Sequence, residues 1–439
     1  MKFYNRTKEI AELQRVKEMA YHDHSKLTVL TGRRRIGKTS LILNALKGET
    51  IVYLFVSRKS EADLCNSFCN EIEKQLSVFV PKMDSFIDVF RFLLEQGQNQ
   101  KFSLVIDEFQ EFININESIY SEMQNYWDRY RTITNINFIV SGSIYSLMTK
   151  IFQDRREPLF GRADVMMKLA PFTTSVLKEI MNDYKPDYTN DELLALYTYT
   201  GGVPKYVELL VDNKALTISK MIKYICQRDS PFIDEGRNLL IQEFGKKYGN
   251  YFSILDAISS GINTQSQIEA FMGEKSIGGQ LSKLETVYEV IKKQRPIFAK
   301  EGSQTVRYEM SDNFLRFWFR YIERNRALIE LGNYEGLSKL ICDDYPTYSG
   351  KTLEVFFKQK LQESFGYRAI DSWWEPKGDQ NEIDIVAITL DNKKALVVEV
   401  KRQKKNFRPQ LFESKIEVLK KKALNNYEIE AVCWDITDM

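Results

Sequence analysis

Histidine and cysteine are both scarce in this chain of 439 residues. There are two histidines, both near the N-terminus, and five cysteines without a regular spacing. Cys65 and Cys69 lie one helical turn apart and could bind a metal ion, but the shortage of histidine favours buried positions on a helix instead. An odd number of cysteines without a disulfide framework is typical of reduced thiols, so we expect a cytoplasmic protein.

Long apolar runs and a strong charge of either sign are also missing. No run approaches the roughly 18 apolar residues that span a membrane, and the stretch MKFYNRTKEIAEL lacks the apolar centre of a secretory signal. We therefore expect no membrane partner. The net charge is +2, so a polyanionic partner has to be inferred from local basic patches.

The length of the chain predicts about three domains, and neither repeats nor low-complexity tracts divide it. At the start of the chain, short β-branched runs alternate with longer amphipathic stretches. This alternation predicts a parallel α/β sheet, because the intervening stretches are long enough for helices. The pattern then becomes mostly helical until strands return near the end. The runs that predict the first strands are residues 27–30, 51–56, 102–107 and 136–143.

The stretch TGRRRIGKTS follows the first of these strands and fits the pattern G-x-x-x-x-G-K-[ST] without a mismatch. Its glycines let backbone N–H groups turn toward phosphates at the positive end of a helix. Lys38 would reach the β and γ phosphates of ATP, and the Thr39 hydroxyl would bind Mg²⁺. A chance glycine-rich turn is the alternative. The nucleotide-binding residues predicted here are Gly32, Arg33, Arg34, Arg35, Ile36, Gly37, Lys38, Thr39 and Ser40.

A second nucleotide motif is the stretch FSLVIDEFQEF, in which an apolar strand leads into Asp107 and Glu108. Asp107 would hold Mg²⁺, directly or through water, and Glu108 would orient and activate the attacking water. Two acids after a strand are common by themselves. Their distance from Lys38 along the chain suits a neighbouring strand of the same sheet, so the two motifs together predict an ATP site.

Several further stretches resemble the AAA+-related, archaeal-type ATPases, which are relatives of the STAND signalling ATPases. FYNRTKEIAEL resembles the N-terminal box that packs against adenine, FIVSGSIYSLM resembles the sensor-1 strand, and TGGVPKYVELL resembles the start of a lid helix. The resemblance implies that the box and the lid lie near the base and that a sensor serine lies near the γ-phosphate. The residues concerned are Asn5, Arg6, Glu9, Ser141 or Ser143, Pro204 and Lys205.

The stretch PLFGRADVMMKLAPF resembles the segment that carries an arginine finger, which implies this role for Arg162. A finger that acts on a neighbouring subunit requires a homo-oligomer. Arg155 and Arg156 are nearby competitors, and Arg162 could instead be a surface residue. Simpler interpretations exist for the other stretches too. Asn5 and Glu9 could cap a helix, the serines could form a turn, and the glycines before Pro204 could end a helix.

Residues 251–310 predict three short helices followed by a β-wing, which is the pattern of a winged helix-turn-helix. Thr264 and Gln267 form a capping box at the second helix. The third helix carries Lys283 but also Glu285, so it is not strongly basic. Direct contact with DNA and a bracing role are both open. The wing is more basic, with Lys292, Lys293, Arg295 and Lys300.

Two apolar strands near the end, IDIVAIT and ALVVEVK, carry charges where a core is expected. Glu399 and Lys401 share one strand face, and Asp384 on the paired strand can lie beside them. This is the D…E-x-K constellation of the PD-(D/E)XK nuclease fold, with Glu354 added from the preceding helix. The carboxylates of Asp384 and Glu399 would hold Mg²⁺, which prefers oxygen ligands, and Lys401 would position water and stabilise charge on the phosphate.

An ordinary surface hairpin is the alternative, because E-x-K pairs are common. The strands are otherwise apolar on both faces, which suits a buried sheet in which an unpaired charge is costly. Ile383 stands where the proline that names the motif would be. A basic cluster follows the strands and could hold a nucleic-acid backbone or form a solvated helix face. Its residues are Lys401, Arg402, Lys404, Lys405, Arg408, Lys415 and Lys420 to Lys422.

The sequence therefore predicts an α/β protein with four parts. These are a P-loop ATPase core at residues 1–170, a helical lid at 171–240, a winged helix with connecting helices at 241–345, and a nuclease-like domain at 346–439. We expect an ATPase that couples ATP and Mg²⁺ to a nucleic-acid nuclease, with DNA as partner. The alternative is a STAND-like switch or DNA-binding regulator, in which the nuclease-like fold only binds a partner.

Overall fold

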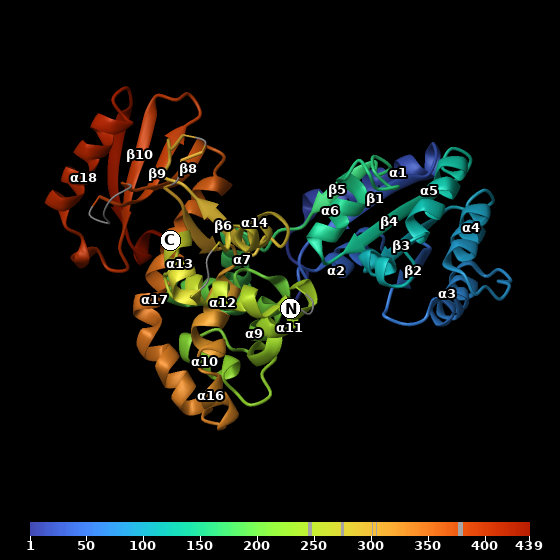
Figure 1. Cartoon of the computed structure of the whole chain (residues 1–439), viewed down its shortest axis with the longest axis horizontal. Coiled ribbons are helices and arrows are strands. Elements are labelled where there is room, and N and C mark those ends of the chain that lie inside the picture. The colour runs from blue at the N-terminus through green and yellow to red at the C-terminus, as the bar shows by residue number, and fades with distance from the viewer. Residues whose placement is uncertain (245–247, 274–275, 301, 304, 376–380) are drawn as a thin grey trace. The chain divides into compact units, whose positions relative to one another are not determined.

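The computed structural model describes residues 1–244, 248–273, 276–300, 302–303, 305–375 and 381–439. The chain divides into two units with their own interiors (Figure 1). The core unit consists of residues Asn5–Ala170, and the C-terminal unit consists of residues Met1–Tyr4 together with Pro171–Met439. No helix in the described ranges is both long and apolar enough to cross a membrane.

The core unit contains a five-stranded parallel sheet with the strand order β2-β3-β4-β1-β5. Strands β1, β3 and β4 are buried along their whole length, which explains their continuous apolar sequences. The predicted parallel α/β sheet is therefore confirmed. The strands are β1 (Lys26–Thr31), β2 (Ile51–Phe55), β3 (Phe102–Asp107), β4 (Ile136–Gly142) and β5 (Val165–Lys168).

Helices cover both faces of this sheet. Alternate residues of the central strands pack with α1 and α2 on one face, and the residues between them pack with α3 to α6 on the other. Cys65 and Cys69 are buried in α3, as the sequence favoured. The helices are α1 (Thr7–His22), α2 (Lys38–Ala45), α3 (Glu61–Leu76), α4 (Phe86–Gln96), α5 (Ile119–Tyr130) and α6 (Tyr145–Gln153), with the 3-10 helix η1 (Phe109–Asn114) after β3.

The C-terminal unit begins with a helical region. Its first helices are α7 (Thr174–Tyr184), α8 (Asn190–Thr200), α9 (Pro204–Asp212), α10 (Ile218–Ile225) and α11 (Phe232–Phe244). Next come α12 (Tyr248–Ser259), α13 (Gln265–Met272) and α14 (Gly278–Thr286), followed by the antiparallel strands β6 (Ile291–Gln294) and β7 (Arg307–Met310), which we call the wing.

An aromatic stretch then crosses the interior of the C-terminal unit. It comprises α15 (Asn313–Phe317) and η3 (Trp318–Glu323), and its large side chains are almost completely buried. After α16 (Arg326–Glu330), the 30-residue helix α17 (Tyr334–Glu363) leads to the last sheet. Helix α17 is continuous through residues 345 and 346, where the sequence placed a domain boundary.

The last sheet is mixed, with the strand order β11-β10-β9-β8. Strands β8, β9 and β10 are antiparallel, and β10 pairs with β11 in parallel. One face of the sheet packs against α17 and the other against α18, so β9 and β10 form the buried sheet that their sequences predict. The elements are β8 (Tyr367–Trp373), β9 (Ile383–Thr389), β10 (Lys394–Val400), α18 (Pro409–Lys422) and β11 (Glu428–Trp434), with short turns η4 (Lys404–Asn406) and η5 (Ile436–Asp438).

Candidate functional sites

The loop between β1 and α2 has the backbone that a phosphate-binding loop needs. Gly37 precedes α2 with a φ of 89°, and Gly32 has a φ of 153°. A Cβ atom on Gly32 would come within 3.1 Å of the Leu169 carbonyl oxygen, so no larger residue fits there without a shift. The glycines of the sequence pattern therefore stand where the loop requires them.

Lys38 is buried, and its ammonium group lies over the same loop. It donates hydrogen bonds to the carbonyl oxygens of Gly32 at 2.8 Å and Arg33 at 3.3 Å. These acceptors hold the charge at the mouth of the loop, and phosphate oxygens are stronger acceptors for it than neutral carbonyls. The contact of Lys38 with phosphate stays a prediction.

Asp107, the last residue of β3, accepts hydrogen bonds from β2, β4 and helix α2 and from the amide of the next residue. One carboxylate oxygen accepts from the Thr39 hydroxyl at 3.1 Å and from the Tyr53 hydroxyl. The other accepts from the Ser141 hydroxyl and from the Glu108 amide at 3.0 Å. Thr39, Asp107 and Ser141, which the sequence singled out separately, thus meet at one carboxylate. Tyr53 was not predicted; burial and the contact with Asp107 raise the pKa of its hydroxyl.

Glu108 is held beside Asp107 by a strained backbone and two side chains. Its φ is 54°, a left-handed conformation that is uncommon for a glutamate. Its carboxylate accepts hydrogen bonds from Ser143 at 2.7 Å and from Gln110 at 2.5 Å. These two hydrogen bonds fix the position of the Glu108 carboxylate. Gln110 stands within the stretch FSLVIDEFQEF, but no role was predicted for it.

The N-terminal box contacts the last residue of the core unit. Arg6 is buried and donates to the Ala170 carbonyl oxygen at 2.6 Å and to Glu9 at 3.1 Å. Asn5 and Arg6 both have positive φ values, and no side chain caps the start of α1. Asn5 is therefore not the helix cap that one alternative suggested.

Arg162 is paired within its own chain. Its guanidinium donates to Asp128 at 3.0 Å and to the Phe160 carbonyl oxygen at 2.8 Å. To act as an arginine finger in the ATP site of a neighbouring subunit, Arg162 would first have to leave Asp128. Pro204, which the resemblance places near the adenine base, begins α9 in the C-terminal unit.

In the last sheet, the Lys401 ammonium faces three oxygen atoms. It lies 2.7 Å from a Glu399 carboxylate oxygen, 3.2 Å from the Val400 carbonyl oxygen and 3.9 Å from an Asp384 carboxylate oxygen. Burial works to lower the pKa of Lys401, but Glu399 and Asp384 outweigh it and raise that pKa. The D…E-x-K residues are thus brought together around one cation, as the alternation along the strands predicts.

Asp384 is largely buried at the start of β9. Its carboxylate accepts a hydrogen bond from the Val400 amide at 2.7 Å, which ties β9 to the end of β10. Burial, together with the neighbouring carboxylates of Glu354 and Glu399, raises the pKa of Asp384 to about 7. An added cation would relieve this crowding of negative charge.

Glu399 has a second lysine partner that the sequence did not reveal. The ammonium of Lys415, on α18, lies 3.3 Å from both carboxylate oxygens, and its side chain is 11% exposed. Lys415 had been counted with the basic cluster after β10. Lys415 lies on the buried face of α18 with Phe412 and Leu419. This spacing in the sequence could have indicated that the side chain of Lys415 turns inward.

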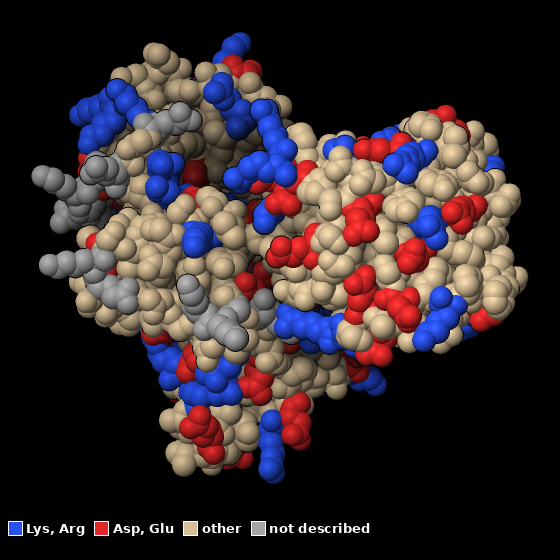
Figure 2. Space-filling view, turned by 45° about the vertical axis from the view of Figure 1, so that its right-hand side comes forward, with Lys and Arg blue, Asp and Glu red and all other residues tan. Residues whose placement is uncertain are grey.

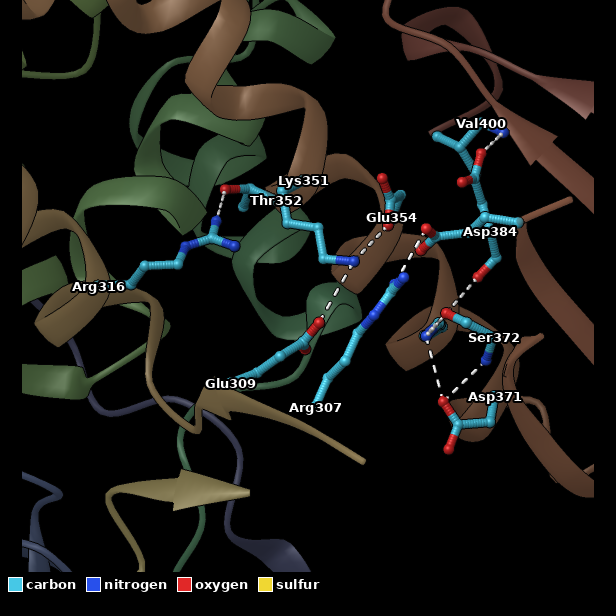
Figure 3. Close-up of polar contacts among 12 residues, drawn as sticks. Arg307, Glu309, Arg316, Lys351, Thr352, Glu354, Asp371, Ser372, Asp384 and Val400 are labelled. Atoms are coloured by element: carbon cyan, nitrogen blue, oxygen red, sulfur yellow. Dashed lines mark hydrogen bonds and ion pairs between the residues drawn. The ribbon is translucent and has the colours of Figure 1, made fainter. Parts of the chain in front are cut away.

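Glu354 joins this site to the wing through one lysine. Figure 3 shows Lys351 between Glu354 of its own helix, at 2.8 Å, and Glu309 of β7, at 3.4 Å. Burial works to raise the pKa of Glu309, but Lys351 and Lys292 outweigh it and lower that pKa, so the carboxylate is held ionised. A cavity of about 390 Å³ lies here, lined by residues that include Lys292, Lys293, Lys351, Glu354 and Lys358.

The oxygen atoms around Lys401 are of the kind that binds a hard divalent cation. Two carboxylates and a backbone carbonyl already surround one positive charge, and oxygen ligands of this kind are those that Mg²⁺ prefers. Among the residues that the structure describes, no group of three or more histidine, cysteine, aspartate or glutamate side chains could hold a metal ion. The fit therefore depends on the Val400 carbonyl as the third ligand.

The basic cluster after β10 does not form one surface. Lys415 is turned inward to Glu399, and Arg402 pairs with Asp191. The remaining members near η4 and at the end of α18 are mostly exposed. In the view of Figure 2, basic side chains gather mainly at the upper left, and acidic side chains are more frequent on the right. Within the wing, Lys292 is 3.6 Å from Glu309, which reduces the free positive charge there.

Comparison with known families matches two parts of the chain. Residues 3–210 match an ATPase domain found predominantly in Archaea, and residues 318–415 match a family of archaeal and bacterial proteins of unknown function. An uncharacterised protein of Methanocaldococcus jannaschii is 30% identical over 399 residues, which cover 89% of this chain and 86% of that protein.

Two solved structures share the fold. A Walker-type ATPase of Pyrococcus abyssi has a TM-score of 0.56 at 18% identity and covers 72% of this chain and 96% of its own. The ORC2 protein of Aeropyrum pernix, solved as ADPNP–ADP complexes, has a TM-score of 0.51 at 12% identity and covers 75% of this chain and 95% of its own. Identities this low show a common fold and no more.

Proposed function

The chain belongs to the family of ATPases found predominantly in Archaea, and we propose that it hydrolyses ATP in the core unit to control a Mg²⁺-dependent nuclease in the C-terminal unit. The observation that carries the nuclease half is the set of three oxygens around the Lys401 ammonium. The observation that carries the ATPase half is the family match together with the cluster of hydroxyls on Asp107.

In the core unit, each side chain has a separate task. Lys38 exchanges its loop carbonyls for phosphate oxygens, while Thr39 and Asp107 supply oxygens to Mg²⁺. Glu108, fixed by Ser143 and Gln110, orients the attacking water and accepts its proton. Mg²⁺, when bound, neutralises charge that develops on the phosphates.

In the C-terminal unit, Asp384, Glu399 and the Val400 carbonyl would hold Mg²⁺, which would polarise the phosphodiester and acidify a bound water. Lys401 then turns from these ligands to the reacting phosphate, where its charge stabilises the additional negative charge. Lys415 stays on Glu399 and keeps its carboxylate oriented. Glu354 supports the site from α17.

We propose DNA as the substrate and partner. The exposed basic residues at η4 and at the end of α18 stand close in sequence to the proposed site and suit a phosphate backbone. Helices α12 to α14 with the wing are proposed as a winged helix-turn-helix that adds contacts to the same duplex. The proposed finger, Arg162, acts only in a homo-oligomer in which it has left Asp128.

One observation favours the second candidate, a switch without cleavage. Glu399 is already neutralised by two lysines, and no larger group of metal ligands occurs in the described ranges. In such a protein the ATP state would set a conformation, and the last sheet would only bind its partner.

Cleavage of supercoiled plasmid and of linear DNA, with Mg²⁺ and with or without ATP, separates the two functions. The wild-type chain should cut in Mg²⁺, and Asp384→Asn and Glu399→Gln should each abolish cutting while ATP binding is kept. A wild-type chain that binds DNA but never cuts it, with Mg²⁺ or Mn²⁺ and any adenine nucleotide, would support the switch.

A further inference from the structure

The ATPase domain of the family extends beyond the core unit. By sequence it reaches residue 210, but the core unit ends at Ala170. Helices α7 and α8 and most of α9 therefore belong to the ATPase domain by family, while they pack as part of the C-terminal unit. The chain passes from the core unit into these helices at Ala170 and Pro171, so they are a covalent connection between the unit that holds the phosphate-binding loop and the unit that holds the last sheet.

Helices α7 and α8 are fastened to the nuclease-like region by polar contacts. Glu363, at the end of α17, accepts from the Thr174 amide at 2.7 Å, at the start of α7. Tyr197 of α8 donates to Gln359 of α17 at 2.6 Å. Asn190, the first residue of α8, donates to the Ile436 carbonyl oxygen at 2.8 Å. The two regions share an extended interface.

Arg402, the residue after Lys401, carries the most direct of these links. Its guanidinium donates to Asp191 in the first turn of α8, at 2.5 Å, and to the hydroxyl of Ser349 on α17. It also stacks on the Tyr345 ring, 4.9 Å from the centroid. Only 17% of the Arg402 side chain is exposed.

Asp191 is fully engaged by this arrangement. One carboxylate oxygen accepts from Arg402 and the other from the Tyr345 hydroxyl, at 2.8 Å. Burial works against the charge on Arg402, but its contacts with Asp191 and Tyr345 outweigh burial and raise the pKa of the guanidinium. A buried arginine with this many partners has one preferred position, so it can transmit a displacement.

The position of Arg402 in the chain gives this link a consequence for the site. The Lys401 amide donates to the Trp434 carbonyl oxygen at 2.9 Å, which continues the pairing of β10 with β11. Side chains alternate along extended backbone, so Lys401 faces Glu399 while Arg402 faces α8 and α17. A shift of the first turn of α8 would therefore move the backbone that carries Lys401.

We propose that Arg402, Asp191 and Tyr345, here called the Arg402 clamp, transmit the nucleotide state of the ATPase domain to Lys401. Arg402 is a positioning residue, since it touches neither metal ligands nor substrate. This inference rests on the proposed function, because it names the route by which ATP would control the nuclease site. The ATP site and the Lys401 site would be coupled because both depend on the position of α8 and the Arg402 clamp.

A matched cluster elsewhere in the C-terminal unit provides the control. Asp344 accepts from Arg320 at 2.6 Å and from the Tyr321 hydroxyl at 2.7 Å, which repeats the chemistry of the clamp. It joins η3 to α17 and includes no residue of α8 or the last sheet. If only the loss of an arginine–aspartate pair matters, Arg320→Gln and Arg402→Gln should change the response to ATP equally. If the clamp carries the coupling, only Arg402→Gln should change that response.

Hydrogen exchange of peptides that cover residues 394–403 is the measurement, in the full chain carrying Glu108→Gln so that bound ATP persists. We expect ATP to change exchange there, and Arg402→Gln to reduce that change by about fivefold or more, with ATP affinity unaltered. Arg320→Gln should keep the change, and Arg402→Lys, which can still reach Asp191, should keep part of it. The proposal is overturned if ATP changes nothing in this segment, or if both glutamine variants behave alike.

Cleavage adds a second readout that separates this inference from the proposed function. If the wild type cuts DNA and ATP alters the rate, Arg402→Gln should remove the effect of ATP while basal cutting persists. If the wild type never cuts, the nuclease proposal fails, and the exchange experiment still decides whether the clamp exists as a link. Persistence of the ATP effect on cutting in Arg402→Gln would contradict the clamp.

Discussion

The two sites hold their acidic residues in different ways. In the core unit, Asp107 is surrounded by neutral donors, namely the hydroxyls of Thr39, Tyr53 and Ser141. In the C-terminal unit, lysines perform this task, with Lys401 and Lys415 on Glu399. Neutral donors orient a carboxylate without cancelling its charge, whereas a paired lysine cancels it.

This difference implies different starting states. If the core site binds Mg²⁺ with ATP as proposed, the charge of Asp107 would be available for that cation. The carboxylates of the last sheet already share an ammonium, so a divalent cation must compete with Lys401. Under the proposed function, the last sheet would be inactive until the lysine moves, as expected for a nuclease under the control of another domain.

The largest expected effect tests the core site alone. Glu108→Gln keeps the shape of the side chain but removes the base, so ATP turnover should fall by about a thousandfold while ATP still binds. Steady-state hydrolysis and equilibrium binding of a fluorescent ATP analogue measure the two quantities. Turnover at the wild-type rate would show that Glu108 is not the base. Glu111→Gln is the matched control, since its carboxylate pairs with Arg58 instead.

The next prediction contrasts the two lysines directly. Both ammonium groups contact carbonyl oxygens. Lys38 should attract the phosphates of ATP, whereas Lys401 should compete with a divalent cation for the same oxygen ligands. Lys38→Ala should lose about a hundredfold in ATP affinity, the scale of a lost charge-assisted contact. Lys401→Ala should stop cleavage yet bind Mn²⁺ at least as tightly as the wild type.

Calorimetric titration with ATP and with Mn²⁺ measures both halves of this contrast. Weaker Mn²⁺ binding in Lys401→Ala would mean that the lysine organises the metal ligands and does not occupy their place. In that case the core site and the last sheet would not differ in how readily they accept a divalent cation.

A smaller effect is expected at the edge of the nuclease site. Glu354 contacts Lys351 and lies near Asp384, so Glu354→Gln should reduce cleavage by about tenfold as a supporting group. Glu309→Gln, which removes the partner of Lys351 on the wing side, is the paired variant. Equal losses in both would mean that the wing positions Glu354; an effect of Glu309→Gln alone would contradict a supporting role for Glu354.

The sequence predicted the core unit well, because the Walker patterns fix both residue type and spacing. The parallel sheet and an archaeal-type P-loop ATPase are confirmed. Tyr53 and Gln110 were missed because their importance comes only from the neighbour that the fold supplies. No local pattern on β2 shows that its tyrosine will meet the end of β3.

The last sheet shows where sequence reasoning reaches its limit. The alternation along β10 correctly placed Glu399 and Lys401 on one face. A run of lysines and arginines, however, does not say which members turn inward, and Lys415 and Arg402 were both assigned to a surface cluster. Their partners, Glu399 and Asp191, come from other elements, and Asp191 is far away in sequence. Whether these residues form a working nuclease remains a prediction.

The smallest effect concerns the pH dependence of stability in the C-terminal unit. The pKa of Asp384 is raised from 3.8 to about 7, mainly by burial and by Glu354 and Glu399. The folded chain therefore binds this proton more tightly than the unfolded chain does. Stability contributed by the protonated acid is complete below pH 3.8 and is lost as pH rises toward 7.

Asp384→Asn should remove this component, because the amide cannot ionise. The difference in Tm between Asp384→Asn and the wild type, measured without divalent ions, should grow in favour of the variant from about pH 5 to pH 8. Mg²⁺ should reverse the trend for the wild type only, since a cation stabilises the ionised carboxylate. A difference that does not change with pH would show that the Val400 amide and Lys401 already keep Asp384 ionised, and the last sheet would then be as well prepared for a cation as the core site.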